Sequence, residues 1–176
     1  MKLSVKLPLA FALSLALLFA GGIFGIYKLN QAIAAFEVDV LGHVAAHKKG
    51  AEVASNFAVA IQEWKNVLLR GKKPEDLDKY WQNHQKEMTD SIALARELDK
   101  LVDDGSPEQA MVTKLIAGLM TAQEGYKQAF DAYKSADMDF AAGDKAARGK
   151  DRDAASVLVE LQKALAKQES AAADEA

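Results

Sequence analysis

The chain has 176 residues, of which 50% are hydrophobic and 27% are charged, with a formal net charge of −3 at pH 7 and no cysteine. The length suits one domain, and the missing thiols exclude a disulfide-stapled fold, a cysteine-ligated zinc or iron–sulfur site, and haem attached through paired cysteines. Nucleic-acid-binding proteins carry basic surfaces that neutralise phosphates, whereas this chain has a net negative charge. We therefore expect no nucleic-acid partner.

The first predicted element is an apolar segment close to the N-terminus. Residues 7–27 form 21 consecutive positions without a charge, and about 20 such residues let a helix cross roughly 30 Å of hydrocarbon. Lys2 and Lys6 precede the segment, and basic residues beside a membrane span favour the cytoplasmic side. We therefore predict a cytoplasmic tail (1–6), a transmembrane helix (7–27) in the bacterial inner membrane, and a periplasmic domain (28–170).

A cleaved signal peptide is the alternative interpretation of the same segment. Signal peptides have apolar stretches of about 7–15 residues, followed closely by a cleavage site of the small-x-small type. The apolar stretch here is longer, and the nearest site of that type, residues 32–34, follows Lys28 and Asn30. We therefore favour the uncleaved anchor. Both interpretations place residues 28–176 on the same side of the membrane.

After the anchor, apolar residues recur at alternating spacings of three and four, which indicates one long helix up to residue 70. The pattern is sustained over five heptads and is typical of a seam between paired helices. His43 and His47 fall on this seam. A basic last turn at Arg70, followed by Gly71, predicts the end of the helix.

Three further helices are predicted downstream. Pro74 and the acidic residues that follow it open the second helix, because proline fits a first turn and acids suit the positive end of the helix dipole. Ser106 begins the capping box of the third helix, with proline at the first helical position. Gly143 and Gly149 bracket a weaker break, after which the fourth helix starts at Asp151 or two residues later.

These elements predict an all-α fold, with an N-terminal transmembrane helix followed by an antiparallel up-down-up-down four-helix bundle. The small acidic tail, residues 171–176, is expected to fray. The first helix stands roughly 65 Å above the membrane, at about 1.5 Å per residue, whereas the fourth helix spans only about 39 Å on the way back. We therefore expect the chain to be the front part of a longer protein rather than one that ends free in the periplasm.

The sequence contains no constellation that is typical of an enzyme. It has no Cys–His pair, no serine elbow, no glycine-rich phosphate loop and no zinc-protease spacing, so we expect neither catalysis nor a cofactor. His43 and His47, at positions i and i+4, could ligate a metal or haem iron, but two half-buried imidazoles bonded to their neighbours are the simpler interpretation. His84 is expected roughly 18 Å away along the bundle and cannot join them.

Basic residues concentrate at the end of the bundle that is far from the membrane. The end of the first helix and the start of the fourth are expected at the same height, which brings together Trp64, Lys65, Arg70, Arg148 and Arg152. Guanidinium groups can grip a carboxylate or phosphate through two hydrogen bonds, and an indole could floor such a pocket. These residues are the candidate site for a small anion. The alternative is a solvated loop region whose cations keep the turns soluble.

The whole plan resembles the sensory region of bacterial methyl-accepting chemotaxis proteins. The resemblance is carried by QEWKNVLLRG (62–71), followed by PEDLDKYW (74–81), and by RGKDR (148–152). It implies ligand sensing by a homodimer in which a small ligand shifts one helix along the membrane normal. The second transmembrane helix, HAMP linker and methylated coiled coil of a complete receptor do not occur in these 176 residues.

We therefore predict the ligand-sensing region of a transmembrane chemoreceptor that acts in signal transduction and chemotaxis. Two other classes stay open at this point. One is a haem- or metal-binding periplasmic bundle that uses His43 and His47. The other is a membrane-tethered bundle with a structural or scaffolding role.

Overall fold

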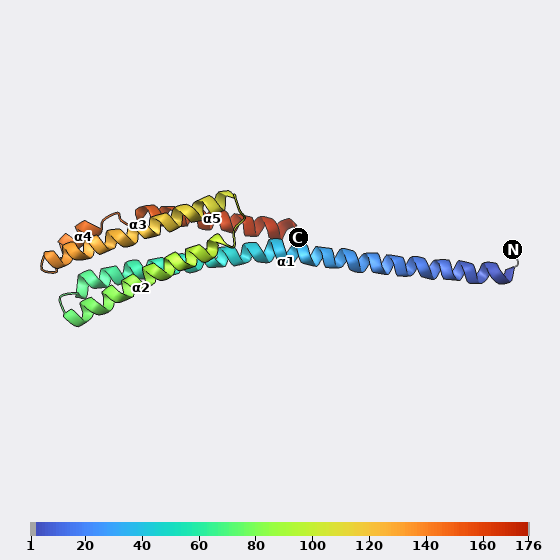
Figure 1. Cartoon of the computed structure of the whole chain (residues 1–176), viewed down its shortest axis with the longest axis horizontal. Helices are drawn as coiled ribbons and strands as arrows, with labels where there is room; N and C mark the ends of the chain where they lie inside the picture. The colour runs from blue at the N-terminus through green and yellow to red at the C-terminus, as the bar shows by residue number, and fades with distance from the viewer. Residues whose placement is uncertain (1–2, 176) are drawn as a thin grey trace.

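The computed structural model describes residues 3–175, with side chains described for 11–34, 36 and 40–174. Within these residues the chain is entirely helical, without a strand, which confirms the all-α prediction. The helices are α1 (Leu3–Arg70), α2 (Pro74–Asp99), α3 (Pro107–Ser135), α4 (Phe140–Ala147) and α5 (Arg152–Glu175) (Figure 1).

The N-terminal half of α1 projects away from all other helices (Figure 1). Its segment Phe11–Ala34 has a mean hydropathy of 1.8, and none of it is buried inside the protein. By length and composition this segment is long and apolar enough to cross a membrane. A signal sequence near an N-terminus meets the same criteria. It overlaps the predicted span 7–27. The side chains of Lys2 and Lys6, on which the orientation depends, lie outside those that the structure describes.

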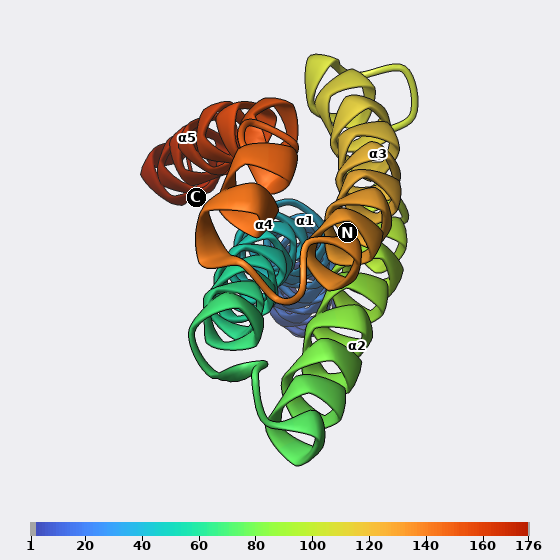
Figure 2. The ribbon, with the colours of Figure 1, turned by 90° about the vertical axis from the view of Figure 1, so that its left-hand side faces the viewer.

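The other half of α1 lies beside the remaining helices, and we call residues 40–174 the helical body. In the body α1 contacts α2 and α5, while α3 contacts α2, α4 and α5. Consecutive long helices run in opposite directions (Figure 1), and Figure 2 looks along them from the end where α4 lies. The apolar core forms two clusters. One lies along the middle of the body, and the other, rich in aromatic residues, lies toward the α4 end.

The turn between α1 and α2 follows the local sequence signals. The helix α1 ends at Arg70, as predicted, and Pro74 occupies the first turn of α2 together with Glu75 and Asp76. Gly71 is buried, and a Cβ built there would lie 2.4 Å from the carbonyl oxygen of Val67. Glycine is therefore the residue that this close backbone approach requires.

The predicted cap at the start of α3 is also present. Ser106 Oγ accepts a hydrogen bond from the backbone N–H of Gln109 at 3.1 Å. The Gln109 side-chain oxygen in turn accepts from the backbone N–H of Gly105 at 2.7 Å. The motif thus pairs the backbone N–H of Gln109, in the first turn, and that of Gly105, just before the helix. In the usual capping box the second donor is the N-cap residue itself, one position later.

One expectation about the last third of the chain was wrong. Gly143, expected at a break, lies inside the eight-residue helix α4, where Asp139 Oδ1 caps the N-terminus by accepting from Ala142 N at 2.8 Å. The helical run is instead interrupted twice, at residues 136–139 before α4 and at the turn around Gly149, which has a φ of +77°. Helix α5 extends through Glu175, into the tail 171–176 for which we predict fraying, and its alanine-rich end has high helix propensity.

Candidate ligand-binding site

A cavity of about 370 Å³ lies at the end of the helical body that carries α4. Helix α1 supplies one wall, α3 contributes Tyr126, and α4 with the following turn supplies the opposite wall. This volume falls in the range of small-molecule sites, which is about 300–1,000 Å³. The lining residues are Ile61, Trp64, Lys65, Leu68, Leu69, Tyr126, Phe140, Asp144, Ala147, Arg148, Gly149 and Asp151.

The aromatic residues below the cavity form a packed cluster. The Trp64 ring lies 5.3 Å from Tyr126 and 6.3 Å from Trp81, measured between ring centroids. Trp81 stacks on Phe130 at 4.0 Å with an interplanar angle of 5°. Tilted, edge-on and stacked arrangements at these distances are favourable beyond the apolar area that they bury. The floor of the cavity is therefore fixed by neighbours from α2 and α3.

Four charged side chains line the cavity, two of each sign. Arg148 Nη2 donates to Asp144 Oδ2 at 3.0 Å, so this pair is largely neutralised within α4 and its C-terminal cap. Lys65 makes no hydrogen bond or ion pair with any described residue, and its side chain is exposed. The cation that has no protein partner in this cavity is thus the Lys65 ammonium.

The fourth charge, Asp151, lies close enough to Tyr126 to influence its phenol. The pKa of the Tyr126 phenol is raised strongly, mainly by burial and further by the nearby Asp151 carboxylate. The Tyr126 phenol therefore stays protonated at every physiological pH.

The structure brings together three of the five residues that we predicted for an anion site. Trp64, Lys65 and Arg148 all line the cavity. Arg70 does not, because its Nη1 donates to the Tyr80 hydroxyl at 2.8 Å and its guanidinium lies 5.5 Å from the Tyr80 ring. Arg152 opens α5 as an exposed residue outside the lining. Trp64 is only 4% exposed, so it offers little of its surface to a ligand.

The histidines take separate environments. His47 Nδ1 contacts Glu169 Oε2 and so joins α1 to α5, whereas His43 is half-buried. His84 is buried, and its Nδ1–H donates to the carbonyl oxygen of Ala60 at 2.8 Å. Burial lowers the pKa of His84, against the opposing effects of this hydrogen bond and of the Glu63 charge. Among the described residues, no group of three or more His, Cys, Asp and Glu is placed to hold a metal ion.

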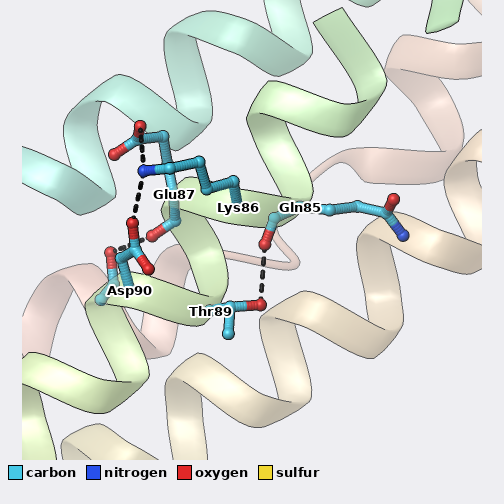
Figure 3. Close-up of polar contacts among 6 residues, drawn as sticks. Gln85, Lys86, Glu87, Thr89 and Asp90 are labelled. Atoms are coloured by element: carbon cyan, nitrogen blue, oxygen red, sulfur yellow. Dashed lines mark hydrogen bonds and ion pairs between the residues drawn. The ribbon is translucent and has the colours of Figure 1, made fainter. Parts of the chain in front are cut away.

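The charged surface of α2 is typical of a solvated helix face. Lys86 Nζ lies 2.6 Å from Asp90 Oδ2 and 3.6 Å from Glu87 Oε1, and Thr89 Oγ1 donates to the Gln85 carbonyl at 2.8 Å (Figure 3). The hydrogen bond with Asp90 is the main reason that the Lys86 pKa is raised. Exposed pairs of this kind contribute little and carry no chemistry.

Among the lining residues that the sequence did not predict are the two other aromatic residues and both carboxylates: Tyr126, Phe140, Asp144 and Asp151. The predicted anion site consisted of cations and one indole, so it did not include the carboxylates at the same end of the body. The signal that was available is the spacing of Asp144 and Arg148, because residues at i and i+4 of a helix face each other. That spacing identifies Arg148 as a paired cation.

Comparison with known proteins gives one distant relative. The chain is 29% identical over 141 residues to the methyl-accepting chemotaxis protein CtpH of Pseudomonas aeruginosa, and the match covers 80% of this chain and 24% of that protein. The chain thus spans about a quarter of the relative's length. No family model matches the chain. No solved structure matches it significantly either. The distant relationship supports a chemoreceptor-related role and agrees with a membrane protein whose apolar helix is N-terminal.

Proposed function

We propose that this chain is the ligand-sensing N-terminal region of a transmembrane chemoreceptor that acts in signal transduction and chemotaxis. The observation that carries the proposal is the relationship to a methyl-accepting chemotaxis protein, because it extends over 80% of the chain. Phe11–Ala34 is the proposed inner-membrane anchor. With the tail 1–6 in the cytoplasm, residues 28–170 form the sensor domain in the periplasm, folded as an antiparallel up-down-up-down four-helix bundle.

The cavity between α1 and α4 is the proposed binding site. Lys65 and Arg148 supply cationic donors at its rim, so the proposed ligand is a small anion. The role is binding rather than catalysis, and it involves no cofactor. Helix α1 carries both the cavity wall and the anchor, and Trp64 stands about 45 Å above the end of the apolar segment at Ala34. Binding therefore acts on the helix that enters the membrane.

A homodimer through α1 completes the proposal. Leu41 and Val59 are exposed, at 51% and 42%, and they lie five helical turns apart on one side of α1. Val44 lies next to them on the same side. Anchoring in a bilayer confines two copies to one plane with their axes roughly parallel, which favours pairing along this side. The two binding cavities then face away from the seam or lie at its edge.

Calorimetry on the full chain in lipid nanodiscs tests the binding function. Amino acids, organic acids, inorganic phosphate and sulfate are titrated separately, and at least one anion is expected to bind. Its affinity should fall at least tenfold in Lys65→Gln and in Arg148→Gln. Lys72→Gln is the matched control, since Lys72 is an exposed lysine outside the lining and loses the same charge. If no compound binds at millimolar concentration, the proposal is wrong.

Topology and dimerisation are tested with single cysteines, for which the cysteine-free chain is well suited. Ser170→Cys should react with a membrane-impermeant maleimide in intact cells after outer-membrane permeabilisation, whereas Ser4→Cys should not. Ser55→Cys, on the exposed side of α1, should form a disulfide between copies. Ala117→Cys, exposed on α3, is the control that should stay monomeric. Equal cross-linking of both variants would contradict the α1 seam.

A further inference from the structure

The composition of the cavity specifies the class of ligand more narrowly than charge alone. We infer that the cavity takes a monocarboxylate with an apolar body, aromatic or branched aliphatic, whose carboxylate binds the Lys65 ammonium. This inference rests on the proposed function, since it names the ligand of the same site. Three properties of the cavity lead to it: the apolar wall, the balance of charges and the distance from the membrane.

The apolar wall comes from both sides of the cavity. Ile61, Leu68 and Leu69 of α1 face the space from one side, and Phe140 and Ala147 of α4 line the other. Leu69 is 67% exposed and Phe140 is 49% exposed, so large apolar surfaces at the rim remain in contact with water. An apolar group that enters between them removes this area from water, which is favourable in proportion to the area. A compact, fully hydrated anion leaves that gain unused.

The charges around the cavity favour a single negative charge on the ligand. Arg148 is already paired with Asp144 at 3.0 Å, and Asp151 is a second carboxylate in the lining. Lys65 is the cation left without a partner among the described residues. One carboxylate on a ligand neutralises Lys65. A second negative charge in the same cavity would meet Asp144 or Asp151, and like charges close together are disfavoured.

The position of the cavity indicates a ligand that arrives from water. Lys65 lies 31 residues beyond the end of the apolar segment on the unbroken helix α1, which corresponds to roughly 45 Å above the proposed membrane. A lipid that stays in the bilayer cannot reach this height. The amphipathic ligand is therefore a soluble small molecule with a short apolar body, and the cavity volume of about 370 Å³ accommodates a body of one aromatic ring.

Calorimetry on the full chain in nanodiscs with four matched probes tests the inference. Phenylacetate supplies one carboxylate and a ring, acetate lacks the ring, phenylacetamide lacks the charge, and phenylmalonate adds a second carboxylate. Phenylacetate is expected to bind at least tenfold more tightly than each of the other three compounds. Acetate loses the apolar burial, in which each methylene-sized group adds about fourfold in affinity. Phenylacetamide loses the Lys65 contact, and phenylmalonate brings a second negative charge to the carboxylates of the cavity. Empty nanodiscs measure partition into lipid, which is subtracted.

Two variants assign the charges. Lys65→Gln should weaken phenylacetate at least tenfold while leaving phenylacetamide unchanged, and Lys73→Gln, an exposed lysine outside the lining, should change neither. Asp144→Asn removes a carboxylate and releases Arg148, so the affinity for phenylmalonate should rise at least fivefold relative to phenylacetate. Circular dichroism confirms that each variant keeps the helical content of the original chain.

The outcomes separate this inference from the proposed function. If inorganic phosphate, sulfate or acetate binds more tightly than phenylacetate and the binding depends on Lys65, the anion-sensing function stands and the apolar monocarboxylate is wrong. If phenylacetate binds equally well to Lys65→Gln, the assigned contact is wrong. If none of the anions binds at millimolar concentration, both the inference and the proposed function fall.

Discussion

The packing of α4 against α1 and α3 controls one wall of the cavity, and Gly143→Ala tests it. A Cβ at Gly143 would lie 2.5 Å from Leu68 Cδ2 and 2.8 Å from Tyr133 Cδ2. Non-bonded carbon atoms prefer separations of about 3.5–4.0 Å, so the added methyl group demands a displacement of roughly 1 Å at each contact. The question is which of the three groups moves.

Leu68 can relieve its own contact by rotating a methyl group, but Tyr133 cannot. The Tyr133 side chain is fully buried, and its hydroxyl donates to the carbonyl oxygen of Leu68 at 3.3 Å. Helix α4 therefore has to move outward. Overpacking of this kind costs about 1–3 kcal/mol, and the better helix propensity of alanine returns up to about 1 kcal/mol. We expect a net loss of about 1–2 kcal/mol, together with weaker ligand binding, because Phe140 and Arg148 move with α4.

Chemical unfolding of the full chain in nanodiscs, followed by tryptophan fluorescence, measures this loss. Both tryptophans, Trp64 and Trp81, lie in the helical body, so the signal reports that part of the chain. Gly42→Ala is the matched control, since it makes the same change inside a helix and its Cβ meets nothing within 4 Å. The control should be unchanged or up to about 1 kcal/mol more stable. If Gly143→Ala is as stable as this control, the described packing of α4 is refuted.

Three further predictions concern the helical body. Because burial lowers the pKa of His84, the body should lose stability as the pH falls below 6.5 and through the lowered pKa, by at most about 1.4 kcal/mol per pH unit. The difference in unfolding free energy between the original chain and His84→Gln should therefore shrink from pH 7 to pH 5. A constant difference contradicts this prediction. Ser106→Ala should cost about 1 kcal/mol in the same unfolding assay through loss of the α3 cap, and no change would mean that the cap is dispensable. Leu119→Ala should lower the free energy of unfolding by about 2–5 kcal/mol because Leu119 is fully buried. Met120→Ala, at the exposed neighbour, should change it by no more than about 0.5 kcal/mol. Similar losses for the two variants would contradict the assigned face of α3.

The end of α1 and the starts of α2 and α3 could be predicted because their causes are local. Gly71, Pro74 and Ser106 act on backbone groups within about four residues of themselves, so their effect is visible in the sequence alone. Gly143 has the same local signature as a helix break, yet it is helical. Its small size serves contacts with α1 and α3 that the sequence does not display. Tertiary packing therefore overrode the local signal at Gly143.

The candidate site was predicted along the helix axes but not around them. Counting residues gives the height of each side chain, and that count correctly put Lys65 and Arg148 at the same end of the body. The direction in which a side chain points depends on rotation of the helix and on its neighbours. Arg70 turns to Tyr80 for this reason, and Arg152 points outside the cavity lining. Height is therefore predictable from a sequence of this kind, whereas the set of groups that face one cavity is not.

The continuity of α1 gives the proposed binding a direct route to the membrane. From Ala34 to Arg70 the helix α1 is unbroken and contains neither a proline nor an adjacent pair of glycines, so no kink of the usual cause absorbs a displacement between the cavity and the apolar segment. A ligand held between Lys65 on α1 and the wall formed by α4 changes how α1 is fixed relative to α3 and α4. Since α1 alone among the described helices continues into the apolar segment, a shift of α1 against its neighbours moves that segment as well. In the proposed receptor, binding in the cavity between α1 and α4 therefore acts directly on the helix that forms the anchor. Binding at a site between α2 and α3 would not.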